Sequence, residues 1–222
     1  MRFIVTGGGI GKPIDEVCLN QALFEKEGVE VIGVIINKVL QEKVDYVADM
    51  TKRGFKRKGL DLLGVIPHRS ILTRPTMNLI REEFKAESLN QSEHVHNLVN
   101  DVVVGAMGVN NAMKFFKPGV LLITPGDRED ILLAAAALGS ASPPQLAGIV
   151  LTGNLRPSDG VLKVIRGMSF PVLLAKDDSY EVASKVHDLI VKTRPDDAEK
   201  ISLIRDLVAK HVDVKKILEA IS

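Results

Sequence analysis

Residues 119–130 read GVLLITPGDRED, an apolar run that passes through a Pro-Gly turn into an acidic stretch. The run is apolar up to Thr124, which is typical of a strand that helices cover on both faces. The stretch after the turn starts a helical pattern, in which Asp127 is a favourable N-cap residue. A strand, a tight turn and a helix in this order predict one unit of an α/β fold.

The same alternation continues in both directions along the chain. We expect strands at Arg2–Thr6, Glu30–Asn37, Asp61–Ile66, Asp101–Val104, Gly119–Thr124, Ala147–Thr152 and Pro171–Ala175. We expect helices at about 13–27, 41–58, 74–84, 108–117, 127–138, 157–167 and 178–191. The segment after Pro195 reads as two more helices, of which Asp213 caps the second. This order predicts α/β layers with largely parallel strands.

The composition changes within residues 82–100, which are polar and lack a core stripe. We place a domain boundary in the first part of this stretch, near residue 85. The chain is then expected to comprise a first domain at 1–85, a second at 86–193 and C-terminal helices at 194–222.

The composition bears on which partners and which cellular compartment we expect. The 222 residues are 45% hydrophobic and carry a net charge of +1, which gives no reason to expect nucleic acid or an acidic membrane as the partner. Cys18 is the one cysteine, so an internal disulfide is excluded and a reducing, cytoplasmic setting is expected. No apolar run approaches the length of a membrane span.

The glycine-rich stretch TGGGIGKP, residues 6–13, invites comparison with a phosphate-binding loop. A Walker A loop needs Gly, four residues, then Gly-Lys-Ser/Thr, whereas Thr6 and Pro13 occupy the first and last of these positions. The dinucleotide pattern G-x-G-x-x-G fails as well, because Lys12 stands where its third glycine belongs. Two readings remain, a tight strand-to-helix turn and a helix N-terminus that holds an anion.

Two polar groups follow strands of the first domain. Asn37 closes a strongly apolar strand, where its amide has the donor and acceptor to read a base edge or acts as a polar end to the strand. Pro67 and His68 end the next strand, and His68 is either a ligand contact or a surface histidine. Open α/β sheets bind ligands at this rim.

Two further turns follow strands of the second domain. Asp127 and Arg128 precede a helix, where the dipole disfavours a cation. Arg128 therefore has a specific partner, which is either a ligand phosphate or a nearby acid such as Asp130. The turn Thr152-Gly153-Asn154 follows the next strand, and its Gly and Asn tolerate left-handed backbone angles. We expect the two turns to form a small cleft suited to binding.

The sequence offers no catalytic set. It contains no Ser-centred nucleophile elbow and no pair of acidic residues arranged for acid–base catalysis. His94 and His96 have no third metal ligand at a spacing typical of metal sites. We therefore expect no metal and no catalytic residue in this chain.

Several segments together resemble known families. Residues 6–17, 28–39 and 62–77 (TGGGIGKPIDEV, GVEVIGVIINKV and LLGVIPHRSILTRPTM) are similar to the C-terminal half of a dethiobiotin-synthetase-like P-loop domain. Residues 102–107, 115–135 and 148–154 resemble the DRTGG domain that follows it in the N-terminal region of long phosphate acetyltransferases. The tail at 186–214 resembles the helical segment that closes that region.

The resemblance implies particular roles for the candidate residues. Asn37 matches the adenine-reading position, with Pro67 and His68 nearby. Asp127 and Arg128 match the first pair of the DRTGG motif, Thr152 and Gly153 match its later part, and Asn154 stands where the second Gly belongs. In that family the Walker A loop lies upstream of residue 6. The chain, which starts at Met1, is thus expected to lack it, as a fragment, as half of a split protein or as a form that lost the ATPase.

The resemblance to DRTGG and paired CBS domains implies adenine-nucleotide sensing rather than catalysis. We expect a non-catalytic regulatory or ligand-sensing protein whose possible ligand is an adenine nucleotide. The alternative is a subunit of an ATP-dependent ligase or of a phosphate acetyltransferase, completed by another polypeptide. A homo-oligomer or a companion P-loop or acetyltransferase chain is the expected partner, because an incomplete parallel sheet leaves an exposed edge.

Overall fold

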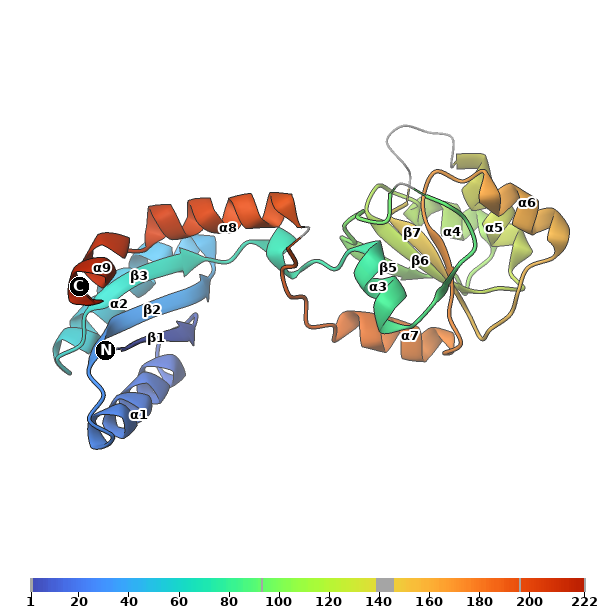
Figure 1. The fold of residues 1–222 in the computed structure, drawn as a ribbon. Coiled ribbons are helices and arrows are strands. Elements are labelled where there is room, and N and C mark those ends of the chain that lie inside the picture. The colour runs from blue at the N-terminus through green and yellow to red at the C-terminus, as the bar shows by residue number, and fades with distance from the viewer. Residues whose placement is uncertain (1, 93, 139–145, 196, 222) are drawn as a thin grey trace. The chain divides into compact units, whose positions relative to one another are not determined.

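The computed structural model describes residues 2–92, 94–138, 146–195 and 197–221 (Figure 1). The chain forms two compact units. The first combines the chain up to Leu72 with the chain from Thr193 onward, and the second is Thr73–Lys192. Each unit is an α/β structure built on a largely parallel sheet, which confirms the predicted fold class. No helix in these described ranges is long and apolar enough to cross a membrane.

The first unit contains a three-stranded parallel sheet in the order β1-β2-β3. Its elements are β1 (Arg2–Gly7), α1 (Lys12–Lys26), β2 (Val31–Val39), η1 (Gln41–Lys43), α2 (Val44–Lys56), β3 (Leu62–Pro67), α8 (Ala198–His211) and α9 (Val214–Ile221). One face of the sheet packs against α1 and α2 through residues such as Ile4, Val17 and Phe55. The junction of α8 and α9 covers part of the other face, where Val212 contacts Ile35 and Leu63.

The outer edge of β3 is covered by this same junction. Val212 forms an antiparallel bridge with Gly64, and the Asp213 N–H donates to the Leu63 carbonyl at 2.8 Å. Gly64 is required here, because a Cβ at this position would lie 2.3 Å from the His211 carbonyl oxygen. Asp213 also accepts from the Lys216 N–H at 3.0 Å, which confirms the predicted cap of the last helix.

The second unit contains a five-stranded sheet in the order β4-β8-β7-β6-β5, in which only β4 is antiparallel to its neighbour. The helix α3 (Met77–Glu83) follows the 3-10 turn η2 (Ser70–Thr73). The remaining elements are β4 (Glu87–Ser88), β5 (Asp101–Val104), α4 (Val109–Ala112), η3 (Met113–Phe115), β6 (Val120–Pro125), α5 (Glu129–Leu138), β7 (Gly148–Thr152), α6 (Asp159–Arg166), β8 (Val172–Leu174) and α7 (Ser179–His187).

Strands β6 and β7 are buried on both faces, as their apolar sequences predict. Alternate side chains enter two separate cores. Leu122 and Ile149 face α4, α5 and α6, whereas Leu121 and Val150 face α3 and α7. The result is a three-layer sandwich, with α5 and α6 on one side of the sheet and α3 and α7 on the other (Figure 1).

The division into units differs from the boundary expected near residue 85. Met77, Ile80 and Phe84 are buried in the core of the second sheet, so the helix that carries them belongs to the second unit. The C-terminal helices pack on β3 and belong to the first unit, where we expected a separate tail. Several helices are shorter than predicted. The predicted helix at 127–138 begins at Glu129. Asp127 is therefore not the residue directly before the helix and is not its N-cap, contrary to our prediction.

The sequence pattern did not reveal β4 or the role of Asn90, which follows it. The Asn90 amide nitrogen donates to the carbonyls of Met168 and Phe170, at 3.2 and 2.9 Å. Its amide oxygen accepts from the Val172 N–H at 2.9 Å. The buried side chain thus continues the hydrogen bonding of the sheet edge past the end of β4.

The turns after β6 and β7 touch through Gly126. A Cβ added to Gly126 would lie 1.6 Å from the Leu155 carbonyl oxygen, so only glycine fits against that backbone. A second contact joins the same two segments: the Glu129 carboxylate, at the start of α5, accepts from the Ser158 N–H at 2.6 Å. The two turns are therefore held together by main-chain packing and one charge-assisted hydrogen bond.

We predict that Asn90→Ala lowers the free energy of unfolding by about 2–3 kcal/mol, because it leaves buried main-chain groups of β8 and the preceding loop without a partner. Urea denaturation measures the loss, and hydrogen exchange at Val172 should accelerate. Asn111→Ala, which removes an exposed amide bound to Lys114, should change stability by less than about 0.5 kcal/mol. Equal effects of the two variants would contradict this assignment.

We predict that Gly126→Ala destabilises the protein by about 1–3 kcal/mol, because neither main chain can yield without moving a turn. Gly160→Ala serves as the matched control, since Gly160 lies in α6 and a Cβ there meets nothing within 4 Å. This control should be neutral or more stable by about 0.5–1 kcal/mol. Thermal unfolding of both variants compares them, and a Gly126→Ala protein as stable as the parent would show that the turns move freely.

Candidate functional site

The carboxyl ends of four parallel strands meet at one edge of the second sheet. Asp127 and Arg128 follow β6, and Gly153 and Asn154 follow β7, of which Thr152 is the last residue. The structure thus brings these candidate residues together on neighbouring strand ends, held by the contact between Gly126 and Leu155. Ligands of open α/β sheets bind at this kind of edge.

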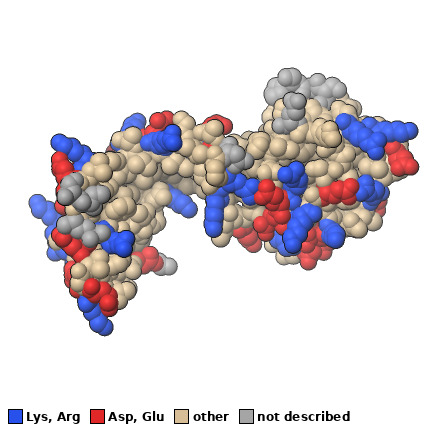
Figure 2. Space-filling view, in the orientation of Figure 1, with Lys and Arg blue, Asp and Glu red and all other residues tan. Residues whose placement is uncertain are grey.

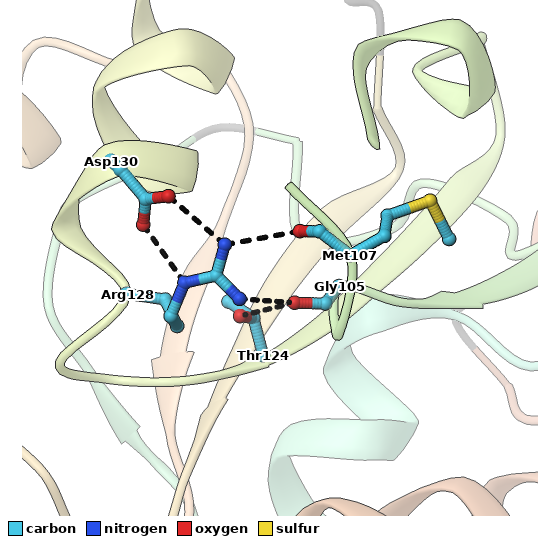
Figure 3. Close-up of polar contacts among 5 residues, drawn as sticks. All are labelled: Gly105, Met107, Thr124, Arg128 and Asp130. Atoms are coloured by element: carbon cyan, nitrogen blue, oxygen red, sulfur yellow. Dashed lines mark hydrogen bonds and ion pairs between the residues drawn. The ribbon is translucent and has the colours of Figure 1, made fainter. Parts of the chain in front are cut away.

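The Arg128 side chain makes several hydrogen bonds at this edge (Figure 3). Its guanidinium donates to both carboxylate oxygens of Asp130 at 2.9 Å. It also donates to the carbonyls of Gly105 and Met107, at 3.2 and 3.0 Å, in the loop after β5. Of the two partners that we considered for Arg128, the structure has the nearby acid, Asp130. The side chain ties the turn after β6 to the loop after β5.

Arg128 and Asp130 form an ion pair at this edge. The Arg128 guanidinium lowers the pKa of Asp130 by a side-chain hydrogen bond, and Asp130 raises the pKa of Arg128 in the same way. The Ser158 N–H lowers the pKa of Glu129. Both carboxylates contribute stability above their ordinary pKa, and this contribution is lost as the pH falls through the lowered value. Acidic and basic side chains are also interspersed across the visible face of the second unit (Figure 2).

The turn after β7 is fixed to the segment after β8. The Thr152 hydroxyl lies 2.7 Å from the Ser179 hydroxyl, and the Gly153 N–H donates to the Asp177 carbonyl at 2.8 Å. The Asn154 N–H donates to the Ala175 carbonyl at 3.0 Å. Gly153 and Asn154 have φ angles of 72° and 53°, which are the left-handed angles expected from their residue types. Both residues are exposed, whereas Thr152 is buried.

The chain leaves β7 and β8 toward opposite faces of the sheet. Helix α6 follows β7 and packs against the same face as α4 and α5. Helix α7 follows β8 and packs against the other face with α3. The exposed residues Gly153 and Asn154 lie at this divergence.

Several residues that shape the edge were not singled out from the sequence. The carbonyls of Gly105 and Met107 carry no signal in a sequence, because any residue has a carbonyl. Ser179 was recognisable, since Asp178 and Glu181 around it form a capping box whose spacing marks a helix start. The helix expected at 178–191 already placed its start here, so a polar turn after a third strand could have been predicted.

The other three candidate residues lie in the first unit. Asn37 is the seventh residue of β2, and its side-chain oxygen accepts from the Lys38 N–H at 2.8 Å. Pro67 is buried at the end of β3, and the His68 N–H donates to the Val39 carbonyl at 2.6 Å. Lys38 has a φ of 62°, and the turn residue Gly8 packs against its carbonyl. The structure therefore brings Asn37, Pro67 and His68 to one edge of the first sheet.

The edge of the second sheet offers hydrogen-bond donors and acceptors. Within the described ranges, no three His, Cys, Asp or Glu side chains gather as a metal site would require. The hollows on this unit include one of about 600 Å³, which Ser88, Asn90 and Arg166 help to line away from the two turns. The Asn90 side chain in its lining already bonds main-chain groups of the sheet edge, so we assign this hollow no ligand.

Comparison with known proteins identifies both a domain family and longer relatives. The DRTGG domain profile matches residues 79–189. The phosphate acetyltransferase of Pseudomonas aeruginosa is 32% identical over 83% of this chain and 28% of its own length. Those of Nitratidesulfovibrio vulgaris and Synechocystis sp. are each 30% identical, over 88% and 93% of this chain. This chain spans less than a third of the length of these relatives.

Among solved structures, one match is the CBS and DRTGG domains of the regulatory region of Clostridium perfringens pyrophosphatase, complexed with its activator diadenosine tetraphosphate. It is 18% identical, with a TM-score of 0.42, over 67% of this chain and 74% of that chain.

The domain profile and the longer relatives confirm the resemblance to DRTGG proteins and to phosphate acetyltransferases. The matched residues, 79–189, lie within the second unit and include both polar turns. They amount to half of the 222 residues, and this chain therefore belongs to the DRTGG-domain family.

Proposed function

We propose that this chain is a non-catalytic regulatory protein whose DRTGG domain binds an adenine nucleotide at the carboxyl edge of the second sheet. The observation that carries the proposal is the meeting of the polar turns after β6 and β7 at the carboxyl edge of the sheet, with Gly153 and Asn154 exposed there. Open α/β sheets bind ligands outside the carboxyl ends of their strands.

The turns favour binding over chemistry. Their polar groups are held by main-chain contacts, such as those from Gly153 to Asp177 and from Asn154 to Ala175, and a rigid edge loses little entropy when a ligand binds. The Asn154 amide projects from a left-handed backbone position and has both the donor and the acceptor that an adenine edge requires. Arg128 supports this edge by fixing the loop after β5.

The charge of the edge constrains how a nucleotide would bind. Asp130 already neutralises Arg128, so phosphates gain little from this guanidinium unless the ion pair opens. We infer that the base and ribose contribute most of the affinity, with Asn154 as the base-reading residue and Arg128 as a positioning residue.

Calorimetric titration of the full chain with ATP, ADP, AMP and diadenosine polyphosphates tests the proposal. We expect a saturable heat with at least one of them, and no heat with inorganic phosphate alone, because recognition depends on the base. Absence of heat with every nucleotide, on protein shown to be folded by circular dichroism, would sink the proposal.

We predict that Asn154→Gly weakens nucleotide binding by about threefold to tenfold, the range expected for the loss of one hydrogen bond between neutral groups. Glycine accepts a φ of 53°, so this substitution removes the amide and keeps the turn. Asn111→Ala, on an exposed helix of the same unit, should leave the affinity unchanged. An unaltered affinity in Asn154→Gly would remove Asn154 from the site.

A second function is favoured by the extent of the similarity to phosphate acetyltransferases. That similarity covers up to 93% of this chain and so extends beyond residues 79–189 into the first unit. In this alternative the chain is a subunit of an acetyltransferase, or of an ATP-dependent dethiobiotin-synthetase-like ligase, which another polypeptide completes. Asn37, Pro67 and His68 would then belong to a nucleotide site shared with that polypeptide.

The neighbouring genes distinguish the two functions. A segment G-x-x-x-x-G-K-[ST] encoded directly upstream, or in an adjacent gene, would favour the subunit. Co-expression of that product with this chain should then give a stable complex with acetyltransferase or ATPase activity. A complex without either activity, together with nucleotide binding by this chain alone, would favour the regulatory protein.

A further inference from the structure

The two edge strands of the first sheet, β1 and β3, differ in whether other parts of the chain bond to their outer side. The edge at β3 is closed by the bridge between Val212 and Gly64 and by the hydrogen bond from Asp213 to Leu63. Among the described residues, β1 pairs only with β2. The sequence of β1, RFIVTG, contains no proline, lysine or acidic residue that would discourage a further strand. The unprotected edge is thus a place for strand pairing.

Large apolar side chains surround this edge on both faces of the sheet. Phe3 and Val5 are 43% and 55% exposed, on the face opposite to the buried Ile4. Val5 pairs with Ile35, which the α8–α9 junction covers, so the apolar surface of that face continues uncovered to the edge. On the other face, Leu19 and Leu23 of α1 are 73% and 58% exposed.

The exposed leucines follow from the position of α1. Residues four apart lie on the same side of a helix, so Leu19 and Leu23 form one stripe. The helix buries Val17 against the sheet and turns this stripe away from that core. An outer helix face is normally polar, and this stripe therefore indicates a further layer of packing.

We propose that β1 pairs antiparallel with β1 of a second copy of this chain, so that two sheets join across a two-fold axis. The interface comprises Phe3 and Val5 on one face of the joined strands and Ile4 on the other. It is independent of nucleotide binding, because the proposed nucleotide site lies in the other unit.

The sequence of β1 is compatible with pairing to itself. Residues directly opposite in an antiparallel pair point to the same face, so a register centred on Ile4 places Phe3 opposite Val5 of the second copy. All four of these side chains then meet on one face. Arg2 lies opposite Thr6 of the second copy, so the register brings no like charges together. A two-fold interface requires self-complementarity of this kind.

The α1 stripe stays outside the interface in this arrangement. A two-fold axis perpendicular to the sheet keeps both α1 helices on the same face, one on each side of the axis. Leu19 and Leu23 lie on the side of α1 that faces away from the sheet, so they do not contact the α1 helix of the second copy. The sheet edge and the face with Phe3 and Val5 are apolar and able to pair with themselves, which favours a second copy over an unrelated strand.

Sedimentation equilibrium of the full chain tests the proposal. We expect a mass of twice 24.2 kDa at about 10–100 µM protein, because a dimer with a micromolar Kd is populated at such concentrations. The Val5→Lys variant places two ammonium groups in the interface and should weaken the dimer by at least about tenfold. Phe3→Lys introduces the same charge at another exposed position of that β1 face and should weaken the dimer as well, even if Val5→Lys fails to fold.

Val164→Lys is the matched control, because Val164 is an exposed valine on α6 of the second unit. It should remain dimeric. A monomeric parent chain at these concentrations would overturn the proposal, as would a dimer that neither Val5→Lys nor Phe3→Lys weakens. A chain that is monomeric alone and forms a complex only with a different polypeptide would also overturn it.

Discussion

Burial of β6 and β7 on both faces is the constraint on which the second unit depends. A strand with no polar face has to be covered by a layer on each side, so the chain crosses from strand to strand through helices. Crossover connections make the strands parallel, and parallel strands place all their carboxyl ends at one edge. The polar turns with Arg128 and Asn154 gather at that edge for this reason. The site is thus a consequence of the core.

The sequence predicted what depends on local pattern. The seven longer strands lie within a residue or two of their expected bounds, and the turn at Gly153 and Asn154 has the backbone angles that its residue types indicate. Local pattern did not reveal β4, because a strand of two residues has no periodicity. The unit boundary shifted because Met77 and Ile80 read as an ordinary apolar stripe, and only tertiary packing assigns that stripe to a sheet.

The sequence allowed us to predict which residues lie at the candidate site. It did not allow us to predict most of the contacts that they make. The unfavourable position of Arg128 near a helix start correctly indicated a specific partner, which is Asp130. Its contacts with main-chain carbonyls of Gly105 and Met107 depend on where the loop after β5 ends, and residue types do not encode this position. Likewise, no sequence pattern announces that Gly126 meets the carbonyl of Leu155.

That glycine contact gives the domain a mechanical property. The backbones of the two turns are in van der Waals contact, so a displacement of one pushes directly on the other, without the damping that side-chain rotation provides. Arg128 extends the linkage to a third loop, and the Gly153 N–H extends it to a fourth. The four loops, which follow four separate strands, are therefore mechanically coupled. A displacement of any one of them moves the starts of α5 and α6 together.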